Sequence, residues 1–425
     1  MDFEVNYNDY DVVIVGTGLI ESIVAGGLSR HLKVLHLEPE GIYGGDNSIH
    51  FPTDYKIIKG KREMESDAQE KLEESEDAFV EGVLQKKRRF NVERTPKLLY
   101  SNGDIIKLIQ NGACPSLEFQ LIKSLYLDGK RVPYSKEDIF SNKEISLIEK
   151  RKMMKLLTTA LEYGATGEDG ITPDLTNDEA VSFLDYLKSL GLKQELITIA
   201  YSAIALNSTN EPLSKKHGLK RMQIHLKSIG IFGPGAFLAS LYGTSSELVQ
   251  AFCRYCAVHG GNYILNYPLD KIKEIKHSNL IVSSKYHQYF TQANLSSNTV
   301  HYVYCITKSF VGEGDNSIVV VPPAEQDGNF VIQLNSHTEC VPEGYYLLVT
   351  FGKDVELLEH SLLPLVQGYG MMWSNTVEIY QDIKVDDIWF VGGTEGMFCQ
   401  DMVERAKEIY HSICTEEFYP KKIYE

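Results

Sequence analysis

Two glycines and a carboxylate near the start of the chain have the types and spacing of a dinucleotide-binding turn. Gly16 and Gly18 follow the apolar run DVVIV and precede a second apolar stretch. Gly16 allows a tight turn, and Gly18 lets the backbone approach a phosphate at the positive end of the next helix. Glu38 follows about twenty residues later, where an acid usually accepts a hydrogen bond from ribose. The pattern predicts a nucleotide-binding scaffold.

Glu21 stands where such a turn usually has its third glycine, and it argues against a bound cofactor. A carboxylate in the first turn can itself satisfy the helix N-terminus. Beside a pyrophosphate, a charge about 4 Å away costs about 4 kcal/mol at an effective dielectric of about 20. We therefore expect a vestigial turn of Gly16, Gly18, Glu21 and Glu38, with no cofactor. The alternative is an ordinary helix acid that rotates away.

The elements around this turn predict an α/β fold of the Rossmann type. Residues 11–16 are expected to form a strand, 19–30 a helix and 33–40 a second strand, which together make a βαβ unit. The charge-dense stretch 59–79 is expected to be a solvated surface excursion. N-G and D-G turns predict hairpins. Further strands and hairpins are expected at 96–112, 121–135, 302–310, 316–323, 345–352 and 387–396, and a final helix at 402–414.

The middle of the chain has helical periodicity instead. Apolar residues at helical spacing predict helices over 146–164, 180–192 and 194–206. We therefore place a small all-helical insertion at 136–216, between two parts of a large α/β domain at 1–135 and 217–425.

A helix after residue 244 carries two cysteines. Thr244 and Glu247 have capping-box spacing, and Gly260 ends the helix. Cys253 and Cys256 form a C-x-x-C pair without a second pair at zinc spacing. We expect buried thiols and no metal site.

Composition narrows the function classes. The 425 residues carry a net charge of −16, which argues against general affinity for nucleic acid or for anionic membranes by charge alone. Seven scattered cysteines and a polar start predict a reducing, cytosolic compartment. No apolar run is long enough to span a membrane. The sequence offers no candidate for a catalytic triad, no metal-ligand spacing and no P-loop.

Three stretches resemble the Rab GDP-dissociation inhibitor and Rab escort protein superfamily. They are VVIVGTGLIES, KVLHLEPEGIYGGDNSIHF and SLYGTSSELVQAFCRYCAVHGGNYILN. The resemblance runs from the first strand to the final helix, and implies a flavoprotein-like (FAD/NAD(P)-binding Rossmann-type) large domain that binds no flavin. RRFNVERTPKLLYSNGDIIKLI and SICTEEFYP resemble the escort branch more closely. One departure is Ser245–Ser246 before Glu247, where the family commonly has glycine.

The resemblance implies a Rab-binding platform on the large domain. From the residues alone, Glu247 and Arg254 lie two turns apart on one helix face, about 10 Å along it. Without the resemblance, they are a capping acid and a solvated cation. The implied platform residues are Tyr43, Gly44, Gly45, Glu247, Arg254 and Ile264.

The resemblance also implies an isoprenoid site in the helical insertion. Periodicity does not distinguish a closed core from a helix pair that parts for a long isoprenoid, and from the residues alone we expect the core. Methionine is adaptable and suits an irregular apolar guest. The implied prenyl-binding residues are Met153, Met154, Leu157, Leu184, Leu187 and Ile197.

The resemblance implies an escort function without catalysis. Such a protein binds GDP-bound Rab GTPases, presents them to the Rab geranylgeranyltransferase heterodimer, and delivers the geranylgeranylated product to membranes that it touches transiently. One alternative is a GDP-dissociation inhibitor that recycles prenylated Rabs. Another, from a different class, is an FAD-dependent oxidoreductase, motivated by the glycine turn and by FVGGTEG at 390–396.

Overall fold

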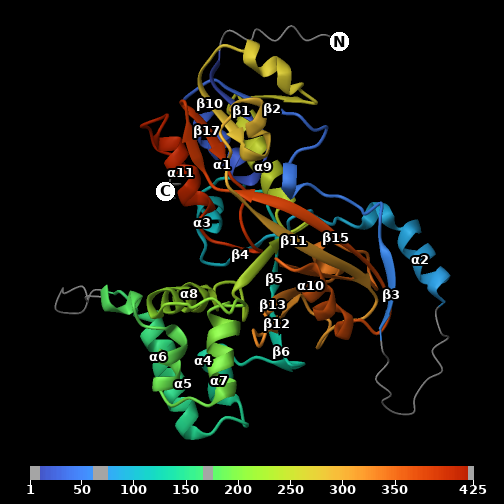
Figure 1. Cartoon of the computed structure of the whole chain (residues 1–425), viewed down its shortest axis with the longest axis vertical. Helices are drawn as coiled ribbons and strands as arrows, with labels where there is room; N and C mark the ends of the chain where they lie inside the picture. Colours follow the sequence, from blue (N-terminus) through green and yellow to red (C-terminus); the bar gives the residue numbers. More distant parts are fainter. Residues whose placement is uncertain (1–9, 61–74, 166–175, 420–425) are drawn as a thin grey trace.

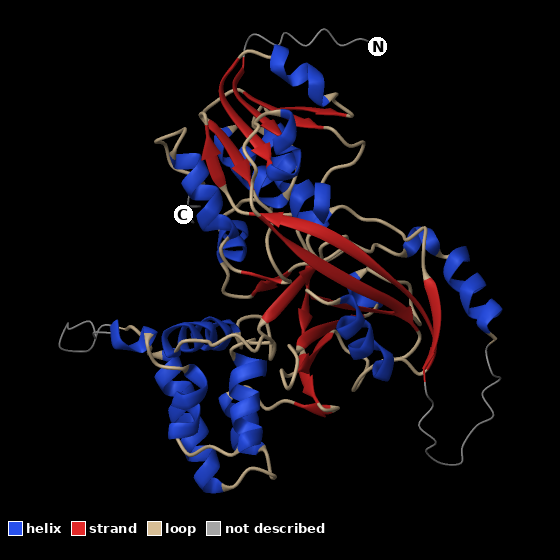
Figure 2. Ribbon diagram, in the orientation of Figure 1, coloured by secondary structure: helices blue, strands red, loops and turns tan. Residues whose placement is uncertain are grey.

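The chain folds into three β-sheets with flanking helices and a protruding helical lobe (Figure 1, Figure 2). The computed structural model describes residues 10–60, 75–165 and 176–419. Most of the charge-dense stretch predicted to be a surface excursion lies outside these ranges. None of the described helices combines the length and the apolar character that crossing a bilayer requires.

A six-stranded sheet carries the glycine turn. Its strands run in the order β16-β17-β10-β1-β2-β9 and are parallel except at the β16–β17 pair. Helices α1, α9 and α11 pack together in one apolar cluster against it. The predicted βαβ unit is confirmed. The bounds are β1 Tyr10–Val15, α1 Leu19–Leu28, β2 Val34–Glu38, α9 Ser246–Val258, β9 Asn262–Leu265, β10 His277–Ser283, β16 Ile383–Val385, β17 Ile388–Val391 and α11 Met402–His411.

Two further sheets complete the large domain. The eight-stranded sheet has the order β3-β15-β11-β14-β13-β12-β6-β7, and the four-stranded sheet has the order β18-β4-β8-β5. Helix α10 packs on β11 and β14. The bounds are β3 Lys56–Gly60, α2 Glu76–Gln85, β4 Leu98–Tyr100, β5 Phe119–Ile122, β6 Ser124–Leu127, β7 Lys130–Arg131, β8 Phe237–Ser240, β11 Ser297–Thr307, β12 Ser317–Val321, β13 Asn329–Leu334, β14 Tyr346–Gly352, α10 Val355–Leu362, β15 Gly368–Tyr380 and β18 Phe398–Cys399.

The helical lobe projects from the large domain (Figure 1). Ser135 and Ser146 each form a capping box, which fixes the starts of α4 and α5. Helix α8 begins at the predicted end of the insertion and packs on α5 and α6. The predicted helix over 194–206 is α7 followed by one π-helical segment, Ile199–Ile204. The bounds are α4 Lys136–Ser141, α5 Leu147–Leu161, α6 Phe183–Ser189, α7 Gln194–Thr198 and α8 Lys215–Ser228.

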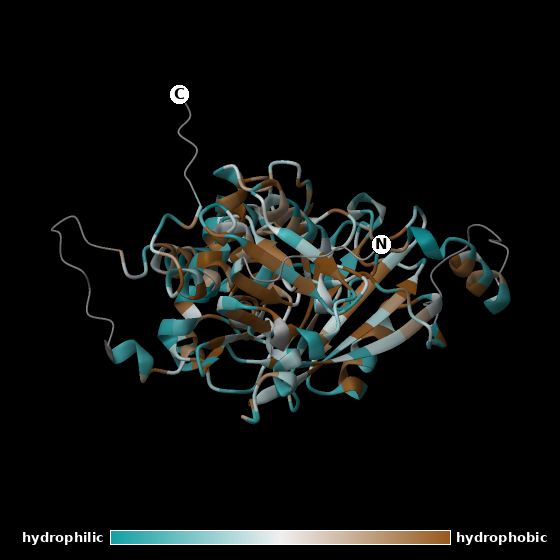
Figure 3. Cartoon of the chain, turned by 90° about the horizontal axis from the view of Figure 1, so that it is seen from above, coloured by the Kyte–Doolittle hydropathy of each residue, from teal (hydrophilic) through white to brown (hydrophobic). Residues whose placement is uncertain are grey.

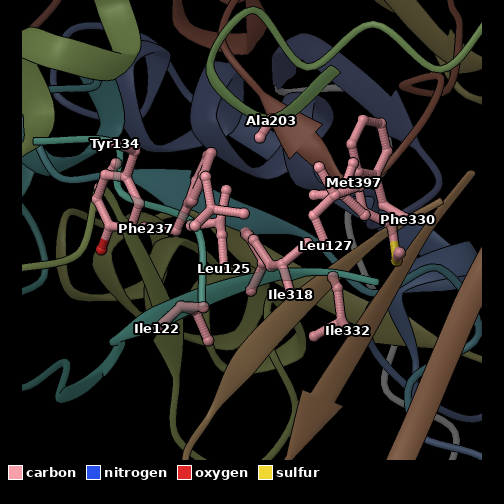
Figure 4. Close-up of a cluster of buried hydrophobic side chains, with 14 of the residues drawn as sticks. Ile122, Leu125, Leu127, Tyr134, Ala203, Phe237, Ile318, Phe330, Ile332 and Met397 are labelled. Carbon is pink, nitrogen blue, oxygen red and sulfur yellow. The ribbon is translucent and has the colours of Figure 1, made fainter. Parts of the chain in front are cut away.

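One apolar core joins the lobe to the sheets. Leu125 and Leu127 of β6 lie beside Ile318 of β12, and Ala203 of the π-helical segment belongs to the same cluster (Figure 4). Apolar residues follow the strands and inner helix faces, whereas polar residues cover the outer loops (Figure 3). The base of the lobe is therefore part of the main core.

One hairpin prediction is wrong. The N-G pair at residues 102–103 is followed by helix α3, Asp104–Gln110, instead of a returning strand. Gly103 is the N-cap, Asp104 lies in the first turn, and Ile105, Ile106 and Leu108 are buried at helical spacing. The D-G hairpin is confirmed, because β6 and β7 pair antiparallel around Asp128–Gly129.

Candidate functional site

The carboxyl group of Glu21 closes the glycine turn. Its side chain is 4% exposed and folds back over Gly18, where a Cβ would collide with it. Burial raises the pKa of Glu21 to about 7, against hydrogen bonds from its own backbone N–H and from Ser283 and the charge of Lys285. The side chain does not rotate away: it occupies the N-terminus of α1.

The hydrogen-bonding capacity of Glu38 is used within the protein. Its Oε2 accepts from the Thr17 backbone N–H at 2.8 Å and from the Thr17 hydroxyl at 2.6 Å. Its Oε1 accepts from the Glu40 backbone N–H at 3.0 Å and from the Tyr286 hydroxyl at 3.2 Å. Because Glu38 is fully buried, no oxygen faces a space that could hold a ribose.

The space left at this turn is too small for a dinucleotide. A cavity of about 50 Å³ remains between the turn, Ser283–Lys285 and the Gly392–Gly393 segment. Pockets that hold drug-sized ligands measure about 300–1,000 Å³. Together with Glu21 over Gly18, this volume means that the residues present do not fit FAD or NAD(P).

A larger surface pocket is lined by α9, Tyr43 and Tyr263. It measures about 320 Å³ and brings together Tyr43, Glu247 and Arg254. Arg254 is exposed, and within the described ranges neither charged residue forms an ion pair with another part of the chain. The pocket is therefore lined by a carboxylate, a cation and an aromatic ring. Its remaining walls are Ser116, Gln250, Ala251, Cys253, Ala257 and Tyr263.

Gly44 and Gly45 shape the loop that carries Tyr43. Their φ values are 108° and 52°, which L side chains rarely adopt. The Gly44 N–H donates to the Thr17 hydroxyl at 2.9 Å, and the same hydroxyl donates to Glu38. This chain of hydrogen bonds fastens the Tyr43 loop to the glycine turn.

Tyr263, which the sequence analysis missed, completes the pocket in place of Ile264. Its ring lies edge-on to Tyr43 with centroids 5.7 Å apart. The neighbouring Ile264 faces the apolar cluster on the opposite side of the sheet, because successive strand residues alternate. The alternation of side chains along β9 places Tyr263 and Ile264 on opposite faces of the sheet. It does not indicate which of the two faces carries the pocket.

His36 holds the Tyr263 hydroxyl by a hydrogen bond. Burial lowers the pKa of His36 to about 4, so the ring is neutral. Its Nε2 lies 2.6 Å from the Gly16 carbonyl oxygen and must donate, which leaves Nδ1 to accept from the Tyr263 hydroxyl at 3.1 Å. The glycine turn thus supports the pocket wall.

The start of α9 is capped by Glu93, which the sequence analysis also missed. Its carboxylate accepts from the Ser245 backbone N–H at 2.8 Å, from the Ser245 hydroxyl, and from the Thr244 hydroxyl at 2.8 Å. The predicted Thr244–Glu247 capping box is wrong, because the N-cap is Ser245 and the Thr244 hydroxyl points to Glu93. Cys253 and Cys256 of α9 are free and buried, as predicted.

The predicted prenyl-binding side chains lie in a closed core. Four are buried, namely Met153, Leu157, Leu187 and Ile197, whereas Met154 and Leu184 are half-buried. A pocket of about 320 Å³ lies nearby, between the β6–β7 hairpin and α7, but none of the six lines it.

Comparisons with known proteins give the family and the fold. The family model described as GDP dissociation inhibitor matches residues 5–309. The "Rab proteins geranylgeranyltransferase component A" of Drosophila melanogaster is 29% identical over 380 residues, which are 80% of this chain and 73% of that protein. "Component A 1" of Homo sapiens is 31% identical over 295 residues, 63% of this chain and 44% of that protein. The matched region thus spans less than half of the human relative.

Solved structures show the same architecture. A Rab GDI from Plasmodium falciparum has a TM-score of 0.69 at 18% identity and covers 96% of this chain and 97% of its own. An oxidoreductase from Methanosarcina mazei has a TM-score of 0.56 at 12% identity, with coverage of 94% and 100%. The fold is therefore flavoprotein-like, as predicted, and with the family match covering most of its length this chain belongs to the GDP dissociation inhibitor family.

Proposed function

We propose that this chain is a Rab escort protein, a non-catalytic subunit that presents GDP-bound Rab GTPases to Rab geranylgeranyltransferase and carries the prenylated product to membranes. The observation that carries the proposal is the closed glycine turn beside an open pocket on α9. The turn has no room for a coenzyme, yet its hydrogen bonds hold the loop of Tyr43. The names of the Drosophila and human relatives support the same assignment.

The α9 pocket is the proposed contact with the GTPase. Tyr43 and Arg254 are of the types enriched at the energetic centres of interfaces. Glu247 adds an opposite charge, so the partner surface must offer both signs. Gly44 and Gly45 shape the loop that carries Tyr43, and Tyr263 lines the pocket. Ile264 packs into the apolar cluster on the opposite face of the sheet.

The helical lobe is the proposed shelter for the lipid. At about 0.8 kcal/mol per buried CH₂, a geranylgeranyl chain of about twenty carbons gains on the order of 10 kcal/mol from burial. That gain can offset parting of the closed core formed by Met153, Leu157, Leu187 and Ile197, with Met154 and Leu184 at its margin. The π-helical segment after α7 supports such a movement, because π-helical turns are uncommon and concentrate at functional sites.

An apolar patch on the outer face of the lobe is the proposed contact with the transferase. Phe140, Leu147 and Ile148 are 76%, 73% and 68% exposed. They end α4 and begin α5, away from the α9 pocket. Exposed apolar residues gathered in this way mark sites of protein association.

A reconstituted prenylation assay tests the proposal. Purified chain, transferase, Rab and geranylgeranyl diphosphate should give prenylated Rab, and omission of the chain should abolish the product. Equal modification without the chain contradicts the escort function. Extraction of prenylated Rab from membranes without any support of prenylation would instead assign a recycling role. A flavin spectrum in the purified protein would contradict the closed turn.

A further inference from the structure

A cluster of cations stands out on this acidic protein. Four consecutive basic residues, Lys86–Arg89, follow the end of α2, and the last three, Lys87–Arg89, form a short 3₁₀ turn. All four are exposed. Within the described ranges, none is held in an ion pair by an acidic side chain. The local charge is therefore the reverse of the overall charge of −16.

Lys308, at the end of β11, brings a fifth cation to the same place. Its Nζ lies 5.3 Å from the centroid of the Tyr345 ring, and the Nζ of Lys86 lies 5.1 Å from the same centroid. Two remote segments of the chain thus converge on one positive surface.

Exposed apolar side chains accompany these cations. Leu84 is 39% exposed in the last turn of α2. Phe310, two residues after Lys308, is 51% exposed. We call Leu84, Lys86–Arg89, Lys308 and Phe310 the basic-apolar patch. Figure 1 shows α2 at the edge of the large domain, remote from the helical lobe.

Stabilisation of the helix explains only part of this arrangement. A cation at a helix C-terminus interacts favourably with the helix dipole within the last turn. Glu76 and Asp77 lie in the first turn of α2, and Glu81, midway along the helix, accepts a hydrogen bond from the Gln85 side chain at 2.9 Å. Neither effect requires four successive cations or a lysine that follows β11, a distant part of the chain.

We propose that the basic-apolar patch docks on an anionic phospholipid surface. Each Lys or Arg near such a surface contributes favourably to the free energy of membrane binding. Apolar side chains inserted among the headgroups strengthen this binding further. An acidic protein is the rival partner, but the exposed Leu84 and Phe310 match an acyl boundary better than a solvated acidic segment. Docking of this patch would bring the protein to the membrane at which it delivers prenylated Rab. Only the identity of the cargo rests on the proposed function, because the docking itself needs no Rab.

Vesicle co-sedimentation of the full chain tests the inference. The probes are phosphatidylcholine vesicles with and without about one third phosphatidylserine. We expect binding only to the anionic vesicles, weakened at least tenfold between about 50 mM and about 300 mM salt. The double variant Lys87→Glu/Arg88→Glu should lose at least tenfold in vesicle affinity.

Lys130→Glu/Arg131→Glu is the matched control. It makes the same change of charge at two exposed residues of β7 and should bind within about twofold of the wild type. Equal losses in both variants, or binding to polyglutamate but not to anionic vesicles, would overturn the inference. Thermal unfolding checks that each variant folds. Prenylation in detergent should be unchanged by Lys87→Glu/Arg88→Glu, so a failure of the escort assay is distinguishable from a failure of docking.

Discussion

The carboxylate of Glu93 caps helix α9 by accepting a hydrogen bond from the backbone N–H of Ser245 at 2.8 Å, across 152 positions of sequence. The same carboxylate accepts from the hydroxyls of Ser245 and Thr244. Glu93 is thus a positioning residue for the helix that carries Glu247 and Arg254.

Replacement of Glu93 should loosen that helix. Glu93→Ala leaves buried donors without an acceptor, so we expect a loss of about 2–4 kcal/mol in the free energy of unfolding, measured by denaturant titration. Glu93→Gln keeps one acceptor oxygen and should cost less and retain more Rab affinity. Glu404→Ala, on an exposed face of α11, is the control. Equal effects of the Ala and Gln variants would contradict the capping role.

Glu21 should impose a pH dependence on stability. Its folded pKa of about 7 exceeds its ordinary value of 4.5, so the folded state holds the proton more tightly. The contribution of Glu21 to stability is therefore present below pH 4.5 and is lost as the pH rises to about 7, by about 3 kcal/mol.

Glu21→Gln isolates this contribution. Burial lowers the pKa of His36 and His225 to about 4 and about 3, so these groups act in the opposite direction over an overlapping range. We therefore expect the stability of the Gln variant relative to wild type to rise between pH 5 and pH 8, as measured by urea unfolding. A constant difference would mean that Glu21 is already ionised at pH 5.

The α9 pocket should account for much of the affinity for Rab. Tyr43→Ala and Arg254→Ala should each weaken binding of GDP-bound Rab about tenfold or more, measured by calorimetry. Lys407→Ala removes an exposed cation from α11 and should have no effect. Unchanged affinity in both pocket variants would place the GTPase elsewhere.

Neighbouring methionines should distinguish the closed core of the lobe from its margin. Met153→Ala empties a fully buried site and should cost about 2–5 kcal/mol in unfolding free energy, whereas half-buried Met154→Ala should cost about 1 kcal/mol or less. If the lobe shelters the lipid, Met154→Asp should weaken prenylated Rab more than unprenylated Rab. Equal losses with both Rab forms would contradict a lipid site there.

The apolar patch of the lobe should act on the transferase alone. Phe140→Ser should lower the affinity for the transferase about tenfold and leave binding of unprenylated Rab unchanged, as measured by separate titrations. Val181→Ser, another exposed apolar position of the lobe, is the control. A parallel loss of Rab binding would indicate a folding defect.

Local patterns predicted what local physics determines. The apolar runs on either side of the glycine turn predicted β1, α1 and β2. The helical spacing of apolar residues predicted α5 and α6. The same rules failed at Asn102–Gly103, where the turn signal is followed by seven residues with helical apolar spacing. The helix forms there because it buries Ile105, Ile106 and Leu108.

Contacts between distant segments could not be predicted. Glu93 has no local feature that indicates a cap for a helix beginning 153 residues later. Tyr263 and Ile264 are both plausible strand residues, and only the packing of α9 against β9 decides which one borders the pocket. Closure of the glycine turn was predictable from Glu21. Its carboxyl group and the phosphate-binding site at Gly18 lie within one helical turn of each other in the sequence.

The hydroxyl of Thr17 joins the glycine turn to the loop that carries Tyr43. It donates to Glu38 and accepts from Gly44, so the glycine turn and the Tyr43 loop are linked through a single side chain. Compounds built as flavin or adenosine mimics therefore find Glu38 already engaged and a cavity of only about 50 Å³ at the turn. Inhibitor design against this chain has to start from the pocket under Tyr43 and Arg254, and selectivity over flavin-dependent oxidases follows from that choice.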